Sequence, residues 1–224
     1  MTEALIIIDI QKDYFPGGRM ELVGAEAAAE RAAFVLGRFR AARLPVVHVR
    51  HESVQKGATF FLPGTEGSEI HPLVAPLPGE TIIDKHDHNS FRHTELMAVL
   101  QQFTATRLTM CGMMTHMCVD TGVRAAFDLG FPCRLVADAC ATRDLVHNGR
   151  VVPAADVQAA YLASLGEVFA KVVNAVDVDL PRTWRSPAWT RPLGPWIRLL
   201  PPWTRRRWPP TRPIPSPRVW KAPR

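Results

Sequence analysis

A carboxylate, an amine and a thiol each follow a predicted strand in this chain. Asp9 ends the first apolar run, Lys85 follows a short strand at 81–84, and Cys118 comes soon after a strand at 107–112. Ligands of open parallel sheets bind at the carboxyl ends of the strands, so these side chains are expected at one edge of a sheet. A thiol nucleophile needs a base to take its proton and a cation to stabilise the thiolate. Alone, Asp9 could be a cap and Lys85 a solvated charge, but together the three residues predict nucleophilic cysteine chemistry.

The segment around Cys118 has the pattern of a strand, a glycine and then a helix. Gly112 ends the strand, and apolar residues recur at helical spacing after Thr115, as at Val119 and Val123. Thr115 is predicted to cap this helix, which places Cys118 in its first turn. Free N–H groups and the positive end of the helix dipole favour a thiolate there and could hold an oxyanion, so a lowered pKa is expected for the thiol. By itself this placement fits a buried structural cysteine equally well.

Strands and helices alternate through the first 180 residues. Strands are predicted at 4–10, 44–49, 81–84, 107–112, 132–136 and 167–173, and helices at 24–42, 92–103, 116–130 and 153–165. Such alternation indicates a parallel sheet with helices on both faces. The Gly- and Pro-rich segment 50–80 has little periodicity and is expected to shape a site, as long loops often do.

The composition changes abruptly near residue 180. Residues 181–224 hold 11 Lys and Arg, no acidic residue, 12 of the 20 prolines and all six tryptophans, whereas residues 1–180 have a net charge of −5. Residues 1–180 are therefore predicted to form one domain, and 181–224 a disordered tail whose prolines block helix and sheet. Interleaved Arg and Trp could bind anionic lipid or nucleic acid. The composition favours instead an extension without function, such as an out-of-frame reading of G/C-rich DNA, and no nucleic-acid or membrane partner is expected.

The cysteines and the apolar runs give expectations about location and cofactors. Four cysteines without CxxC spacing, and no signal peptide, indicate a reducing cytoplasm. Cys111, Cys133 and Cys140 are expected to be small buried hydrophobes. The apolar run at 4–8 is too short to span a membrane. Without a GxGxxG motif or a P-loop, no nucleotide cofactor is expected.

Longer motifs surround the three candidate catalytic residues. They read IDIQKDYF from Ile8, KH followed by NSF and TEL from Lys85, and GMMTHMCVDT from Gly112. With these motifs in this order, the chain resembles the isochorismatase-like cysteine hydrolases, the superfamily that contains nicotinamidases, over residues 3–178. The resemblance implies an α/β fold, a Rossmann-like three-layer αβα sandwich with a mainly parallel six-stranded sheet. It also implies that Asp9, Lys85 and Cys118 form a catalytic triad.

The same resemblance implies how the site is completed. A cis peptide is implied between Met113 and Met114, and it would aim the N–H groups of Met114 and Cys118 at an oxyanion. Phe15 often lines the pocket in this family, and with Gln11 it is the expected substrate contact, although Phe15 fits a core aromatic equally well. We also expect a homo-oligomer.

The expected reaction is cleavage of a small-molecule amide through a thioester on Cys118. An isochorismatase-type vinyl ether hydrolase is an alternative, but such family members generally lack the nucleophile, so Cys118 argues against it. The alternative outside enzymes is a protein that binds an anionic surface through the basic tail.

Six histidines fall in the region where some family members hold a metal ion. They are His48, His51, His71, His86, His88 and His93. Nicotinamidases with a metal carry an Asp-x-His pair after the second strand, where this chain reads His48-Val49-Arg50-His51-Glu52. Solvated loop histidines are therefore expected, and no metal.

Overall fold

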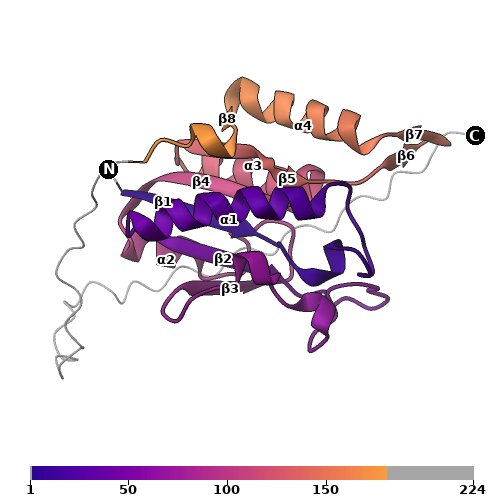
Figure 1. The fold of residues 1–224 in the computed structure, drawn as a ribbon, viewed down its shortest axis with the longest axis horizontal. Helices are drawn as coiled ribbons and strands as arrows, with labels where there is room; N and C mark the ends of the chain where they lie inside the picture. The colour runs from indigo at the N-terminus through magenta and orange to yellow at the C-terminus, as the bar shows by residue number, and fades with distance from the viewer. Residues whose placement is uncertain (1, 181–224) are drawn as a thin grey trace, which may run out of the picture. The chain divides into compact units, whose positions relative to one another are not determined.

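The computed structural model describes residues 2–180, which form a six-stranded sheet covered by helices (Figure 1). Its strands are β1 (Thr2–Ile8), β2 (Val46–His51), β3 (Thr81–Lys85), β4 (Ala105–Met113), β5 (Cys133–Ala141) and β8 (Ala170–Val173). The strand order is β3-β2-β1-β4-β5-β8, and every neighbouring pair is parallel. The predicted parallel sheet is confirmed.

The helices lie on both faces of this sheet. They are α1 (Ala25–Ala41), α2 (Leu96–Gln102), α3 (Asp120–Asp128) and α4 (Ala154–Val168). Parallel strands are joined by right-handed crossovers, so the strand order puts α1 on one face and the other three helices on the opposite face. Figure 1 shows α1 lying across its face of the sheet. The predicted three-layer αβα architecture is therefore confirmed.

The central strand β1 pairs with β2 and β4 up to its carboxyl end. Its residues 4–8 are all buried, as expected for a parallel strand covered on both faces. Ile8 pairs with Val49 of β2 and with Gly112 of β4. A Cβ at Gly112 would lie 2.0 Å from the carbonyl oxygen of Ile8, and the φ of Gly112 is +139°. Only glycine therefore lets β4 approach β1 so closely beside the site.

The helix that carries Cys118 begins differently from the prediction. A π-helical turn spans Thr115–Val119, and α3 follows it from Asp120. Thr115 does not cap this turn, because its Oγ1 lies 3.1 Å from the carbonyl oxygen of Ala141 and 2.6 Å from Oε1 of Gln158. The cap prediction was wrong because the hydroxyl group bonds to β5 and α4 instead.

Other boundaries also shift. The helix predicted from residue 92 begins only at Leu96, and β5 runs on to Ala141. A short antiparallel hairpin, β6 (Leu145–His147) with β7 (Arg150–Val152), was not predicted.

The long segment between β2 and β3 folds back over the end of β1. It contains the short 3-10 helices η2 (Glu66–Ser68) and η3 (Pro72–Val74). The N–H of His71 donates to the carbonyl of Ile10, and the N–H of Lys12 donates to that of Glu69. This loop is therefore hydrogen-bonded to the segment that follows Asp9, and its role in shaping a site stays a prediction.

The predicted tail, residues 181–224, lies outside the described residues. Within residues 2–180, no helix combines the length and the apolar character needed to cross a bilayer.

Candidate active site

The sheet brings the three predicted catalytic side chains into contact. Lys85 Nζ lies 2.8 Å from Asp9 Oδ2 and 3.3 Å from Cys118 Sγ. Asp9 directly follows β1, Lys85 ends β3 and Cys118 follows β4, so all three stand at the carboxyl edge of the sheet. Since β2 lies between β1 and β3, Lys85 reaches across the end of β2 to meet its partners. All three residues are buried.

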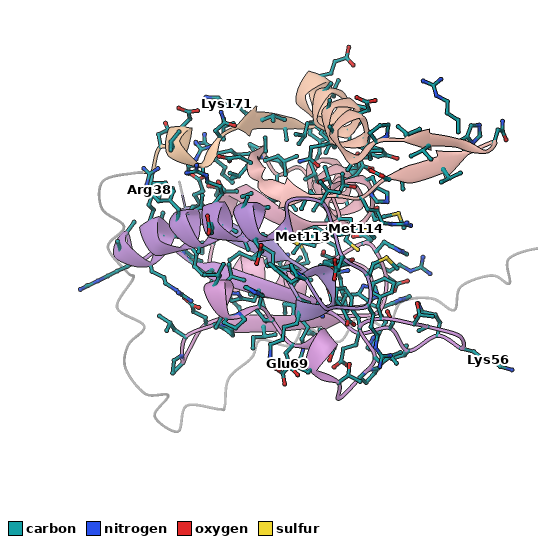
Figure 2. The ribbon with its side chains drawn as sticks, turned by 45° about the vertical axis from the view of Figure 1, so that its right-hand side comes forward. Arg38, Lys56, Glu69, Met113, Met114 and Lys171 are labelled. Atoms are coloured by element: carbon teal, nitrogen blue, oxygen red, sulfur yellow. The ribbon has the colours of Figure 1, made fainter. Side chains whose placement is uncertain are left out.

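The turn before Cys118 has the geometry that the resemblance implied. The peptide between Met113 and Met114 is cis, and both residues are labelled in Figure 2. The carbonyl of Met114 accepts hydrogen bonds from the N–H groups of Met117 and Val119, which closes the π-helical turn around Cys118. Cys118 is thus held in the first turn after β4.

Burial governs the protonation of the triad. It raises the pKa of Asp9 above its ordinary value, and the nearby Lys85 only partly opposes this. Burial, followed by the charge of Asp9, raises the pKa of Cys118, again against the opposing effect of Lys85. Burial alone would lower the pKa of Lys85, but Asp9 and Cys118 raise it. The resting site therefore holds a neutral thiol beside an ammonium, and the expected lowering of the Cys118 pKa was wrong.

His51 belongs to this cluster, although sequence reasoning placed it among solvated loop histidines. It is the last residue of β2 and pairs in register with Lys85. Its Nδ1 lies 2.8 Å from Lys85 Nζ, and the residue is buried. His48 is also buried in β2, where its Nε2 lies 3.0 Å from Glu80. His51 lies at the end of the strand between those that carry Asp9 and Lys85, and this placement comes from strand order and register rather than from a local sequence pattern.

The same cluster contains three side chains of types that bind metal ions. Ligand atoms of Asp9, His51 and Cys118 lie within 4.8 Å of one another. However, the Lys85 ammonium contacts all three residues, so a divalent cation would meet a positive charge at the same place. These residues do not fit a metal while Lys85 keeps its position.

The predicted pocket residues Gln11 and Phe15 do not join the triad. Gln11 is fully buried; its Nε2 donates to the carbonyls of His51 and Ser68, and its Oε1 accepts from the N–H of His51. The whole amide is therefore engaged in bonds within the protein, and the substrate contact expected of Gln11 stays a prediction. Phe15 stacks on the ring of His71, with 3.7 Å between ring centroids.

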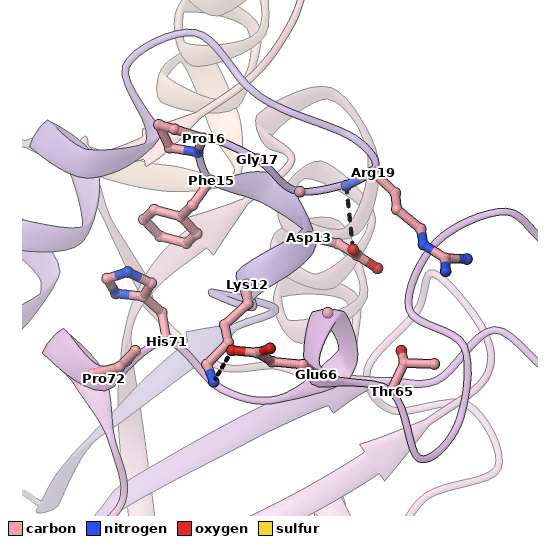
Figure 3. Close-up of a pocket in the computed structure, with 12 residues that line it drawn as sticks. Lys12, Asp13, Phe15, Pro16, Gly17, Arg19, Thr65, Glu66, His71 and Pro72 are labelled. Atoms are coloured by element: carbon pink, nitrogen blue, oxygen red, sulfur yellow. Dashed lines mark hydrogen bonds and ion pairs between the residues drawn. The ribbon is translucent and has the colours of Figure 1, made fainter.

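Phe15 and His71 line a pocket of about 620 Å³ between the segment after β1 and the loop that contains η2. Figure 3 shows their rings facing each other in this pocket, with Lys12 bonded to Glu66 nearby. None of the three triad residues is among its lining residues, all of which are described. This pocket is therefore distinct from the immediate surroundings of the triad.

The comparison with known proteins places the chain in a family. Residues 3–175 match the family model of the isochorismatase domain. The chain belongs to the isochorismatase family. It is 49% identical to the isochorismatase family protein YddQ of Bacillus subtilis over 172 residues, which cover 77% of this chain and 96% of YddQ.

Two further relatives extend the comparison. An isochorismatase-family hydrolase structure from Oleispira antarctica is similar with a TM-score of 0.76 at 50% identity, covering 78% of this chain and 94% of that chain. Ureidoacrylate amidohydrolase RutB of Azorhizobium caulinodans is 24% identical over 169 residues, covering 61% of this chain and 74% of RutB. The chain is thus a hydrolase of the isochorismatase family, with an amidohydrolase among its relatives.

Proposed function

We propose that this hydrolase cleaves the amide bond of a small molecule through a thioester on Cys118. The observation that carries the proposal is the position of Lys85, whose ammonium lies 2.8 Å from a carboxylate oxygen of Asp9 and 3.3 Å from Sγ of Cys118. A base, a cation and a thiol in mutual contact are the parts that covalent catalysis by cysteine requires.

Asp9 acts first, as the general base. Its raised pKa makes it a stronger proton acceptor than an ordinary aspartate, which suits proton transfer from a thiol near neutral pH. As the proton moves from Sγ to the carboxylate, the Lys85 ammonium stabilises the thiolate that remains. The thiolate then attacks the amide carbonyl carbon, and we assign the N–H groups of Met114 and Cys118 to the oxyanion.

The second half of the reaction returns the proton. When the C–N bond breaks, protonated Asp9 gives its proton to the nitrogen, so the amine leaves neutral and the acyl group stays on sulfur. Asp9 then takes a proton from water, whose oxygen attacks the thioester carbonyl. The acid departs and the thiol regains its proton, which restores the starting state.

The family relationship supports an amide substrate, because RutB is an amidohydrolase by name. The buried site favours a small molecule, since Asp9 and Lys85 are at most 1% exposed and Cys118 is 4% exposed. Vinyl ether hydrolysis gives the thiol no role, so Cys118 argues against that alternative.

An ammonia-release screen over small primary amides tests the proposal. The full-length chain and Cys133→Ala, a matched control for loss of a buried thiol, should release ammonia, whereas Cys118→Ala should release none. Ammonia release that persists in Cys118→Ala would refute the thioester route. Consumption of a vinyl ether, with no amide cleaved, would replace the proposal by the alternative hydrolase.

The screen also separates the enzyme from a binding protein. A chain that cleaves nothing, yet binds heparin or anionic vesicles in a salt-dependent way that is lost on removal of residues 181–224, would act through its basic segment instead.

A further inference from the structure

The ring of His51 is held in one position beside the triad. Gln11 binds the backbone of His51 on both sides, because its Oε1 accepts from the N–H and its Nε2 donates to the carbonyl, each at 2.8 Å. The ring packs near those of Phe61 and His88, with 6.1 Å between centroids in each case. One ring nitrogen lies within 4.8 Å of Asp9 and Cys118 ligand atoms. The imidazole is therefore a rigid neighbour of the reacting sulfur.

Contact with Lys85 determines which nitrogen of this ring carries hydrogen. An ammonium can only donate hydrogen bonds, so Nδ1 of His51, 2.8 Å from Lys85 Nζ, must be the acceptor. In a neutral imidazole the hydrogen then resides on Nε2. Burial and the charge of Lys85 lower the pKa of His51 to about 3, so the ring stays neutral at physiological pH.

The resulting Nε2–H has no acceptor among residues 2–180. The only hydrogen bond of the His51 side chain to a described residue is the one to Lys85. Its Nε2 is also absent from the set of fully enclosed polar atoms without partners, and the residue keeps 7% exposure. Because this atom is not fully enclosed, it can donate to water or to an acceptor on a ligand that enters beside His51.

We propose that His51 donates a hydrogen bond from Nε2 to an acceptor atom on the acyl part of the substrate. His51 thereby selects amides that carry an oxygen or nitrogen acceptor near the scissile carbonyl. This inference rests on the proposed amide cleavage and names the class of amide that is preferred. A neutral histidine that serves as a hydrogen-bond donor beside a reacting carbonyl has precedent in enzymes.

Two variants of His51 separate its contact with Lys85 from its contact with substrate. In His51→Asn, the amide oxygen can still accept from Lys85, but no donor reaches the place of Nε2. In His51→Gln, the longer side chain can place an N–H near that position. His93→Asn is a matched control, because His93 is exposed and bonds to Asp87 instead.

The substrates are isosteric pairs in which one member has the acceptor and the other has a carbon. Nicotinamide with benzamide and methoxyacetamide with butanamide are suitable, and the readout is the ratio of kcat/KM within each pair. The wild type and His93→Asn should prefer the acceptor-bearing member of at least one pair. His51→Asn should lose about threefold to tenfold of that preference, as expected for one neutral hydrogen bond, and His51→Gln should keep part of it. An unchanged ratio in His51→Asn, or no preference in the wild type, would overturn the proposal.

A second measurement does not depend on turnover. In ¹⁵N-histidine-labelled full-length chain, with the His51 signals assigned from His51→Asn, NMR should show a neutral ring with its proton on Nε2 at about pH 5–8. A ring that titrates near the ordinary histidine pKa, or carries its proton on Nδ1, would contradict the proposal. If this tautomer is found but no amide is cleaved, the proposed function fails and the assignment of the His51 donor stands.

Discussion

Replacing Asp9 by Asn should separate the reactivity of the thiol from catalysis. Asp9 is the residue whose charge raises the pKa of Cys118, whereas Lys85 lowers it. Asn keeps the size and the acceptor oxygen but has no charge, so Cys118 would face the ammonium alone. The variant should therefore have more thiolate at neutral pH, yet it should lack the group that carries the proton to the leaving amine.

The size of the effect follows from the geometry. Ligand atoms of Asp9 and Cys118 lie within 4.8 Å of one another. At that separation, and at an effective dielectric constant of about 20, two unit charges repel by about 3.5 kcal/mol, which corresponds to about 2.5 pKa units. Nucleophilicity falls as the pKa falls, so the observed alkylation rate should rise only about 20-fold. Amide turnover should fall by about 10²–10⁴-fold, the usual contribution of a general acid–base.

Alkylation with iodoacetamide near neutral pH, followed by peptide mapping, measures the first effect, and ammonia release measures the second. Cys111, Cys133 and Cys140 are internal controls, because all are buried and burial raises the pKa of each. Slower or unchanged alkylation of Cys118 in Asp9→Asn would refute the electrostatic argument. Near wild-type turnover in this variant would remove Asp9 as the base.

Four further changes have definite expected outcomes. Lys85→Met leaves the buried carboxylate of Asp9 without its cation, so the free energy of unfolding at neutral pH should drop by about 3–5 kcal/mol. The pKa of the Asp9 carboxyl is already raised by burial in the wild type, and loss of the ammonium raises it further, so the loss of stability should grow as the pH rises through the wild-type folded pKa and shrink on acidification. The exposed Lys56→Met should change stability by less than about 0.5 kcal/mol. Urea unfolding followed by far-UV circular dichroism is the suitable measurement, because all six tryptophans lie outside the described residues. Gly112→Ala should lower the free energy of unfolding by at least about 3 kcal/mol or abolish folding, since its Cβ would collide with a β1 carbonyl. The control Gly37→Ala, in open space on α1, should stabilise the protein by about 0.5–1 kcal/mol. A tolerated Gly112→Ala would contradict the close approach of β4 to β1. Chelation with EDTA should leave turnover intact. Turnover that is lost on addition of EDTA and restored by a metal would disprove the argument that the Lys85 ammonium excludes a metal from the site. Removal of residues 181–224 should preserve both turnover and melting temperature because the family match ends at residue 175, and aggregation or inactivity of the shortened chain would show that the segment is needed.

The triad could be predicted from sequence because its members occupy strand ends. The carboxyl ends of parallel strands share one edge, so Asp9, Lys85 and Cys118 could be placed near one another before their distances were known. The uninterrupted apolar run before Asp9 marked the central strand, because β1 is covered on both faces and its residues 4–8 are all buried.

His51 and Gln11 could not be assigned because their roles depend on strand register and loop return. Nothing in the sequence shows that His51 lies opposite Lys85, and the pairing of β2 with β3 decides it. Likewise, Gln11 binds Ser68, which is 57 residues away in the chain. Polar side chains with long-range partners are assigned by the fold rather than by local pattern.

The starts of two helices were misjudged because local side-chain bonds compete with the helix. His93 adopts a left-handed backbone with φ of 55°, and the hydroxyl of Thr94 donates to the carbonyl of Ser90. These features delay α2 to Leu96, although the apolar spacing looks helical from residue 92. Thr115 is a similar case, because its hydroxyl has partners on other elements.

The ammonium of Lys85 has fewer hydrogens to donate than there are acceptors around it. Its ammonium has three hydrogens to donate, but four acceptors lie around it: Asp9 Oδ2 and His51 Nδ1 at 2.8 Å, the Asp87 carbonyl at 3.1 Å and Cys118 Sγ at 3.3 Å. In the resting site the neutral thiol is the most distant and weakest of these acceptors, so it receives the weakest hydrogen bond from Lys85. Once the proton has moved to Asp9, the thiolate is a stronger acceptor than the protonated carboxyl. Rotation about the Cε–Nζ bond of Lys85 can then direct a hydrogen to the thiolate without moving a heavy atom. The ammonium can thus follow the negative charge from oxygen to sulfur within a rigid, closely packed site.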